Sequence, residues 1–331
     1  MEQNSKFIVK NIGKFKNIVL HPCISLDNCN KIFRYISDNV SPTIGASTGM
    51  YGQYWFIVNG EKAIFKTFET APLNSLLRIT NELVCQELAK QIDLPCARYE
   101  VAELDGRNGL ISYNVTAENE KLISGAELFE FLDIRKKNNV LTYYEALQIG
   151  KFCGYKIHVT QEVLNLYKLC IFDYLTFQGD RHMNNLFFVF NENKQTIKFS
   201  PIIDNEMSFC CMDIYPELLG NNQSLSLESI LQSYNDSQML SIYPLKNENN
   251  KHDDIGQQII RFAKRLDVGM NVLRSVLNKI NIEDAIENAE KHNIKISNEY
   301  KNFMINIFNY NINRLSQYLD LTTTTDTDKT L

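Results

Sequence analysis

The chain lacks the features that would assign it to a disulfide-rich, zinc-binding or membrane-spanning class. It has eight cysteines among 331 residues, and none are spaced as Cys-x-x-Cys, so we expect reduced thiols and no zinc site. No signal-peptide core is found near the N-terminus, and no apolar run reaches transmembrane length. We therefore expect a cytoplasmic protein without membrane insertion, although a protein exported by a non-classical route would have the same pattern.

An excess of positive charge is also missing. The 34 lysines and arginines are outnumbered by 39 aspartates and glutamates, which gives a net charge of −5. This balance argues against nucleic acid as a partner. Hydrophobic residues make up 44% of the chain, enough for two lobes or one large domain with a substantial core.

The most informative segment that is present begins at Gln178 and reads Gln-Gly-Asp-Arg-His-Met-Asn-Asn. In it Asp180 precedes Asn185 by five residues, and Asp204 ends a later apolar run. Phosphoryl transfer from ATP uses one Asp to accept the proton of the attacking hydroxyl, and an Asn and a second Asp to hold Mg²⁺. The spacing matches the catalytic loop of kinases. It predicts Asp180 as catalytic base and Asn185 and Asp204 as magnesium ligands.

The surrounding sequence predicts how these residues meet. Two apolar runs, Leu186–Phe190 and Ile197–Ile203, flank a polar turn and indicate a hairpin. The first strand starts after Asn185 and the second ends at Asp204, so both would lie at one end. His182 is a second catalytic candidate, since an imidazole can donate to the γ-phosphate or offset its charge. The competing interpretation is a polar loop without a catalytic role.

Residues before this loop supply candidates for nucleotide binding. Lys66 lies in the second of two strands, 54–58 and 62–68, which Asn-Gly joins as a hairpin, and a strand-borne lysine can reach the α and β phosphates. A helix expected over 74–91 carries Glu82 and Glu87, and periodicity does not decide which of them pairs with Lys66. A glycine-rich segment and an interlobe connection complete the candidates for nucleotide binding: Gly45, Ser47, Thr48, Gly49, Tyr113 and Val115.

The distribution of elements predicts an α+β, bilobal protein-kinase-like fold. We expect a β-rich N-lobe with one helix over 1–115, a mainly helical C-lobe over 116–321, and a disordered tail over 322–331. Strands are also expected at 97–104 and 109–115, and a helix at 28–38. The expected C-lobe helices cover 125–138, 143–159, 162–177, 254–277 and 297–318.

These segments resemble the bacterial HipA-like Ser/Thr kinases, particularly the short cell-translocating kinase A type. Asp180-Arg181-His182-x-x-Asn185 is similar to the family's Asp-x-His-x-x-Asn loop, and the sequence from Asn81 to Ala89 resembles its N-lobe helix. The resemblance implies ATP and Mg²⁺ as cofactors, Lys66 as phosphate contact, and Glu82 rather than Glu87 as its partner. It also implies autophosphorylation in the phosphate loop, where Ser47 and Thr48 supply hydroxyls.

The chain departs from the family at two places. Asp204 is followed by Asn-Glu rather than Phe-Gly, which questions the usual activation-segment switch, and the glycine-rich segment has no lysine. The catalytic string is also similar to phosphoinositide 3- and 4-kinases, but the stretch from Met207 to Ser241 contains no Lys or Arg to meet an anionic membrane. A phosphoinositide kinase and a non-catalytic nucleotide-binding scaffold are therefore alternatives to a Ser/Thr protein kinase of unknown substrate.

Overall fold

The computed structural model describes residues 18–19, 53–58, 61–67, 72–104, 107–134, 140–210 and 255–327. The helix expected at 28–38, the glycine-rich segment with Gly45, Ser47, Thr48 and Gly49, and the stretch 211–250 lie outside the described residues.

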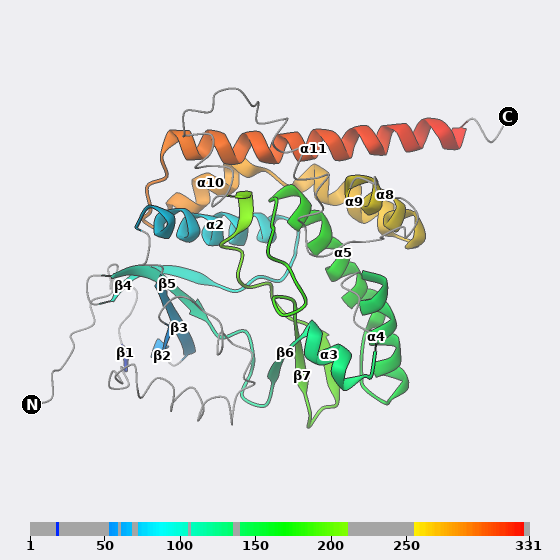
Figure 1. Ribbon diagram of the computed structural model, residues 1–331, viewed down its shortest axis with the longest axis horizontal. Helices are drawn as coiled ribbons and strands as arrows, with labels where there is room; N and C mark the ends of the chain where they lie inside the picture. Colours follow the sequence, from blue (N-terminus) through cyan, green and yellow to red (C-terminus); the bar gives the residue numbers. More distant parts are fainter. Residues whose placement is uncertain are drawn as a thin grey trace, which may run out of the picture.

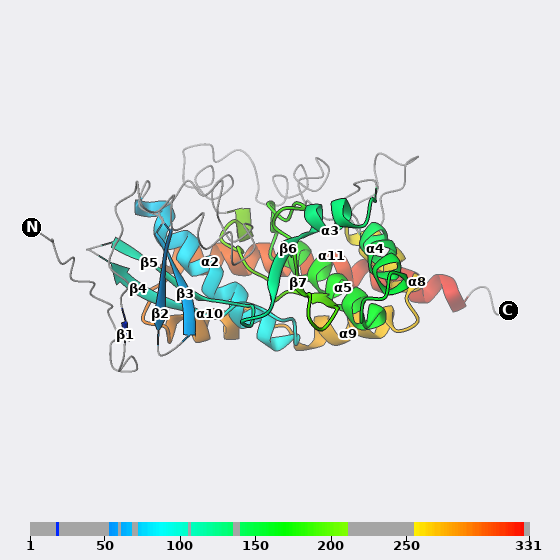
Figure 2. The same cartoon turned by 90° about the horizontal axis from the view of Figure 1, so that it is seen from below.

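An antiparallel five-stranded sheet forms one end of the molecule (Figures 1 and 2). Its strands are β1 Ile18–Val19, β2 Gln53–Val58, β3 Glu61–Thr67, β4 Tyr99–Leu104 and β5 Arg107–Tyr113, in the order β1-β2-β3-β5-β4. The strands predicted at 54–58, 62–68, 97–104 and 109–115 are confirmed to within two residues. Lys66 lies on β3 opposite Leu110 of β5, near the middle of the sheet.

Helix α2, Pro72–Gln91, lies between this sheet and the helices of the other half (Figure 1). The prediction of a helix over 74–91 is confirmed. Nearly every side chain from Leu77 to Ala89 is buried, including polar ones, because α2 has the sheet on one side and α10, Ile282–Glu290, on the other. Its C-terminal end is fixed by a reciprocal pair of hydrogen bonds between the Gln91 side chain and the backbone of Asn281, at 2.6 and 2.9 Å.

A second, three-stranded sheet contains the predicted hairpin. Its order is β6-β7-β8, with β6 Lys121–Ser124, β7 Phe187–Asn191 and β8 Thr196–Phe199, all antiparallel. The hairpin is confirmed, but its second strand ends at Phe199 instead of Ile203, since Pro201 lacks the amide hydrogen that a ladder needs. The sequence did not predict β6, which is only four residues long and completes the sheet through a pairing distant in sequence.

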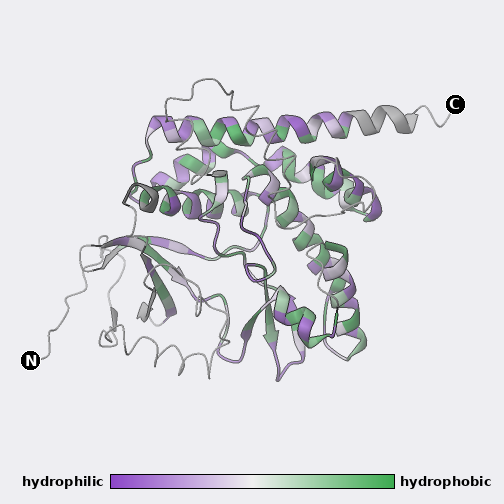
Figure 3. Cartoon of the chain, viewed as in Figure 1, coloured by the Kyte–Doolittle hydropathy of each residue, from purple (hydrophilic) through white to green (hydrophobic). Residues whose placement is uncertain are grey.

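Helices form the rest of the second half, and hydrophobic and hydrophilic residues alternate along them as expected for helices that bury one face (Figure 3). In chain order they are α3 Gly125–Phe131, α4 Val140–Phe152, α5 Val159–Leu175, the short 3₁₀ turn η2 Ser208–Cys210, α8 Ile255–Arg265, α9 Gly269–Lys279, α10 and α11 Asn298–Thr327. Their buried side chains form one core with α2 and the sheet strands.

Several predicted helix boundaries differ from the structure. The helix expected over 125–138 ends at Phe131, and the one expected over 143–159 ends at Phe152, two residues before Gly154 with its φ of 98°. The helix expected over 254–277 is two helices, because Gly269 lies against the backbone of Ala263 at the turn between α8 and α9. Helix α10 was not predicted.

The tail is the last difference. Helix α11 continues to Thr327, so residues 322–327, which were expected to be disordered, are helical. Extending an existing helix needs no new nucleus, so a threonine run can follow it. No helix in the described part of the chain combines the length and apolar character required to cross a bilayer. The α+β bilobal architecture is confirmed, while the division at residues 115 and 116 stays a prediction.

Candidate active site

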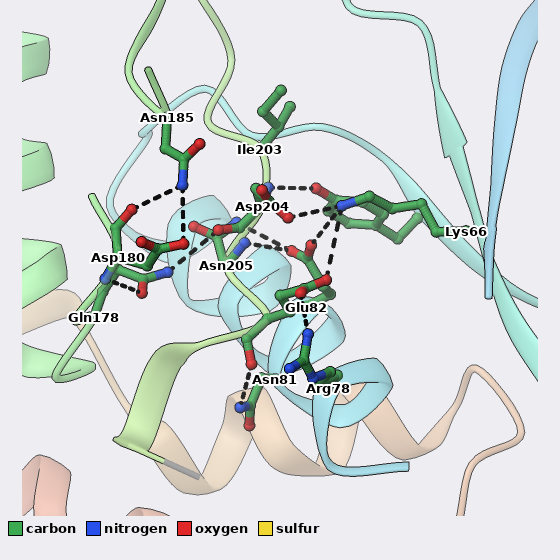
Figure 4. Close-up of polar contacts among 12 residues, drawn as sticks. Lys66, Arg78, Asn81, Glu82, Gln178, Asp180, Asn185, Ile203, Asp204 and Asn205 are labelled. Carbon is green, nitrogen blue, oxygen red and sulfur yellow. Dashed lines mark hydrogen bonds and ion pairs between the residues drawn. The ribbon is translucent and has the colours of Figure 1, made fainter. Parts of the chain in front are cut away.

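The predicted catalytic loop follows α5 directly. Asn185 donates from Nδ2 to the carbonyl of Asp180 at 2.9 Å and to its carboxylate Oδ2 at 3.0 Å, which closes the loop on itself (Figure 4). The Asp180 amide in turn donates to Oε1 of Gln178 at 3.0 Å. The five-residue spacing therefore brings the expected base and the expected metal-binding carboxamide into contact.

His182 lies beside the same carboxylate. Its Nδ1 accepts the Asn184 amide at 3.2 Å, so a neutral ring carries its proton on Nε2, which is 3.5 Å from Oδ1 of Asp180. Half of each side chain is exposed. Burial raises the pKa of Asp180 above its usual value. A carboxylate with a raised pKa is a stronger proton acceptor, as the predicted role requires.

Lys66 lies among three carboxylates that come from two distant parts of the chain. Its Nζ is 2.8 Å from Asp204 Oδ1, 3.6 Å from Glu82 Oε1 and 3.9 Å from Glu206 Oε2 (Figure 4). Glu87 instead accepts from Lys90 at 2.6 Å and faces His292 at 3.4 Å. The structure thus pairs Lys66 with Glu82, the choice that periodicity left open.

The charges in this cluster determine one another's pKa. Burial alone would lower the pKa of Lys66, but attraction to the three carboxylates raises it above its usual value. Burial would raise the pKa of Asp204, but Lys66 holds it below its usual range. Glu206 responds in the opposite way, since burial and repulsion from Asp204 raise its pKa to about 7. Lys66 and Asp204 therefore remain charged at neutral pH.

The Arg181 guanidinium holds the predicted catalytic loop and the segment of the predicted metal ligand Asp204 together. It is almost fully buried and donates to both carboxylate oxygens of Asp173 on α5, at 3.2 and 3.3 Å. It also donates to the carbonyls of Asn185 and Ile203, at 3.3 and 2.8 Å, and to Oδ1 of Asn205 at 2.6 Å. One side chain thereby fixes the positions of both predicted metal ligands relative to each other.

The donor set suits Mg²⁺. The lowered pKa of Asp204 supplies a charged carboxylate, and Asn185 uses its nitrogen for Asp180, which leaves its oxygen Oδ1 as an available ligand. Carboxylate and carboxamide oxygens are ligands that Mg²⁺ prefers. Glu82, Asp204 and Glu206 form another group close enough to hold a cation, but the ammonium of Lys66 lies among them.

Three polar residues of this site were not predicted. Glu206 forms a close ion pair with Arg78 of α2, and the Tyr99 hydroxyl accepts a hydrogen bond from the Asp204 amide at 3.2 Å. No spacing rule points to Arg78 or Tyr99. Glu206 could have been predicted from the sequence. It is the Glu of the Asn-Glu pair that stands in place of Phe-Gly after Asp204, and it adds an acid next to the predicted metal ligand.

The predicted interlobe connection begins inside the five-stranded sheet, because Tyr113 is the last residue of β5. The Tyr113 amide donates to the carbonyl of Arg98 at 3.1 Å, and the Tyr113 ring lies under the Arg98 guanidinium at 3.6 Å. The Tyr113 amide is thus bonded within the sheet, and a contact of the Tyr113 backbone with adenine stays a prediction. Val115, which is half-buried between the two sheets, stays a predicted adenine contact.

No protein-family model matches the chain, and neither does any curated protein. Among solved structures, it is similar to the proinflammatory kinase CtkA of Helicobacter pylori, with a TM-score of 0.54 and 14% identity over 82% of this chain and 95% of that one. It is also similar to HipA in the HipA–HipB–operator DNA complex of Shewanella oneidensis MR-1, with a TM-score of 0.50 and 12% identity over 83% of this chain and 65% of that one. At these identities the likeness shows the fold alone: the chain has a bilobal kinase-like fold.

Proposed function

We propose that this protein is an ATP- and Mg²⁺-dependent kinase that transfers the γ-phosphate to Ser or Thr hydroxyls of proteins. The observation that carries the proposal is that two groups of polar residues from separate parts of the chain are held together by Arg181. It donates to the carbonyl of Asn185 in the loop and to that of Ile203 beside Asp204, while Lys66 joins Asp204 to Glu82. A general base, a metal-binding pair and a strand lysine held by a helix glutamate are the parts that phosphoryl transfer uses. Two structural neighbours are described as kinase or HipA, which agrees with this assignment.

In the proposed reaction each side chain has a defined task. Asn185 occupies Oδ2 of Asp180, so Oδ1 is the atom that accepts the proton of the attacking hydroxyl. Lys66, oriented by Glu82, holds the nucleotide phosphates by charge. Asn185 and Asp204 would hold Mg²⁺, which when bound neutralises charge on the β and γ phosphates.

Autophosphorylation belongs to the proposal. Ser47 and Thr48 lie between Gly45 and Gly49, outside the described residues, in the segment expected to approach the γ-phosphate. A phosphate there would add nearly two negative charges and repel ATP, which gives self-inhibition. Mass spectrometry after incubation with ATP tests this: phosphate only on other hydroxyls, such as those from Ser224 to Ser233, would contradict self-inhibition and leave the kinase proposal intact.

The decisive experiment compares acceptors. Purified protein is incubated with γ-labelled ATP and Mg²⁺ alone, with casein, and with phosphoinositide vesicles. We expect label on protein and none on lipid, and loss of transfer in Asp180→Asn but not in Asp267→Asn, which changes an exposed aspartate on the α8–α9 turn. Label on lipid only would favour a phosphoinositide kinase, and nucleotide binding without transfer would favour a scaffold.

A further inference from the structure

The segment from Asp204 to Phe209 has an unfavourable backbone at both ends. Asp204 has a φ of 63° and Phe209 a φ of 60°, both in the left-handed region that non-glycine residues avoid. Such residues persist only where surrounding contacts determine the backbone. The metal-binding position of Asp204 therefore depends on what holds this segment.

Helix α2 supplies that hold through Asn81, which is fully buried. Its Nδ2 donates to the carbonyls of Glu206 at 2.9 Å and Ser208 at 2.7 Å, so both of its N–H groups cap the segment. Its Oδ1 accepts the hydroxyl of Tyr300 on α11 at 2.6 Å. The reversed carboxamide would place an oxygen against two carbonyl oxygens, so these partners allow one orientation only.

Asn81 stands beside Glu82, the partner of Lys66, and the two neighbours act on the same segment. Glu82 Oε2 accepts the Asn205 amide at 2.9 Å (Figure 4). Asn81 caps the carbonyls on either side of Met207. Together they fasten to α2 a segment in which Asn205 and Glu206 follow Asp204, where kinases commonly carry Phe-Gly.

We propose that Asn81 is a positioning residue for the predicted magnesium ligand Asp204: its carboxamide, oriented by Tyr300, clamps the segment 204–209 to α2. Asn81 itself touches neither metal nor nucleotide in this role. The clamp connects three elements, α2, the predicted metal-binding segment and α11. The role in metal binding rests on the proposed kinase function, whereas the clamp itself does not.

The test combines two measurements on Asn81→Ala and Tyr300→Phe. The first is hydrogen exchange of the Asn205, Ser208 and Phe209 amides, which are bonded in the structure to Glu82, Asn205 and Thr176. Since Asn81→Ala leaves two buried carbonyls without their donor, we expect exchange there to accelerate about 10- to 100-fold. Tyr300→Phe should produce a smaller change at the same amides, and it remains usable if the alanine variant does not fold.

The second measurement is the Mg²⁺ concentration that half-saturates ATP binding, followed by thermal shift. Loss of a residue that orients a metal ligand typically weakens metal binding about 10- to 100-fold, and we expect this for Asn81→Ala with a smaller change in ATP affinity at saturating Mg²⁺. The matched control is Asn311→Ala, because Asn311 of α11 is equally buried and donates to two carbonyls, of Tyr174 and Leu175, at 2.8 and 3.5 Å.

The outcomes distinguish a failure of the clamp made by Asn81 from a failure of the proposed kinase function. Asn311→Ala should lower the melting temperature without changing the metal dependence or the exchange of residues 204–209. Unchanged exchange in folded Asn81→Ala, or the same change in Asn311→Ala, would overturn the clamp. Wild-type protein that binds no Mg²⁺–ATP would refute the proposed function, while the exchange measurement would still decide whether Asn81 holds the segment.

Discussion

Replacement of Arg181 by methionine gives the sharpest test of how the site is held together. The variant removes a guanidinium that makes five hydrogen bonds and leaves Asp173 buried without its counter-charge. Breaking a buried ion pair by removing one partner costs about 3–5 kcal/mol. At an unfolding entropy of about 2.1 cal/mol/K per residue, a chain of this size should then melt roughly 4–7 °C lower.

A double-mutant cycle separates this electrostatic cost from lost packing. Asp173→Asn removes the negative charge, so adding it to Arg181→Met should recover part of the loss, with a coupling of about 2–3 kcal/mol by urea denaturation. Arg98→Met is the control, since its bidentate pair with Glu61 is half exposed and should contribute about 1 kcal/mol. Additive effects of Arg181→Met and Asp173→Asn would refute the reasoning, as would an equal loss in Arg98→Met.

Three further predictions concern single side chains. Asp180→Asn should lower turnover by about 10²–10⁴ with unchanged melting, because the carboxamide keeps the shape and loses the proton acceptor; near-normal turnover would remove Asp180 as base. Asp204→Ala should weaken the Mg²⁺ dependence of nucleotide binding, and an identical Mg²⁺ titration would remove Asp204 from the metal site. Glu87 is buried, but hydrogen bonds from His292 and Lys90 lower its pKa from 4.5 to about 2, so it stabilises the fold above pH 4.5 and loses this contribution as the pH falls to about 2. Glu87→Gln should flatten that acid limb in thermal denaturation, and an unchanged pH profile would contradict the assignment.

Local signals predicted the secondary structure around the candidate catalytic residues well. The hairpin after Asn185 could be predicted because its strands are short apolar runs around a polar turn. The hairpin geometry brings Asp204 back toward the loop that contains Asp180. The strand that carries Lys66 could be predicted because Asn-Gly marks the turn before it. In each case the information lies within about 20 residues.

Contacts between distant segments were not predictable. Arg78 and Asn81 are polar residues on a helix that is buried on both sides, and hydropathy assigns such residues to solvent. Strand β6 was missed because its pairing partner lies more than 60 residues away. Helix α10 was missed although its start carries a local signal, the N-cap Asn281 followed by the acidic Glu283 and Asp284. The clamp around Asp204 is thus a property of packing between α2, α11 and the segment 204–209.

The location of Lys66 has a mechanical consequence. Of the cluster, only Lys66 is carried by the five-stranded sheet; Glu82 is on α2, and Asp204 and Glu206 are on the segment that α2 holds. Moving the sheet away from the helical half would withdraw one cation from three carboxylates and leave Arg78 and Arg181 as the positive charges near them. The ion pairs of Lys66 therefore help to hold the sheet against the helical half, and because this lysine is mostly buried, salt should screen the attraction only weakly.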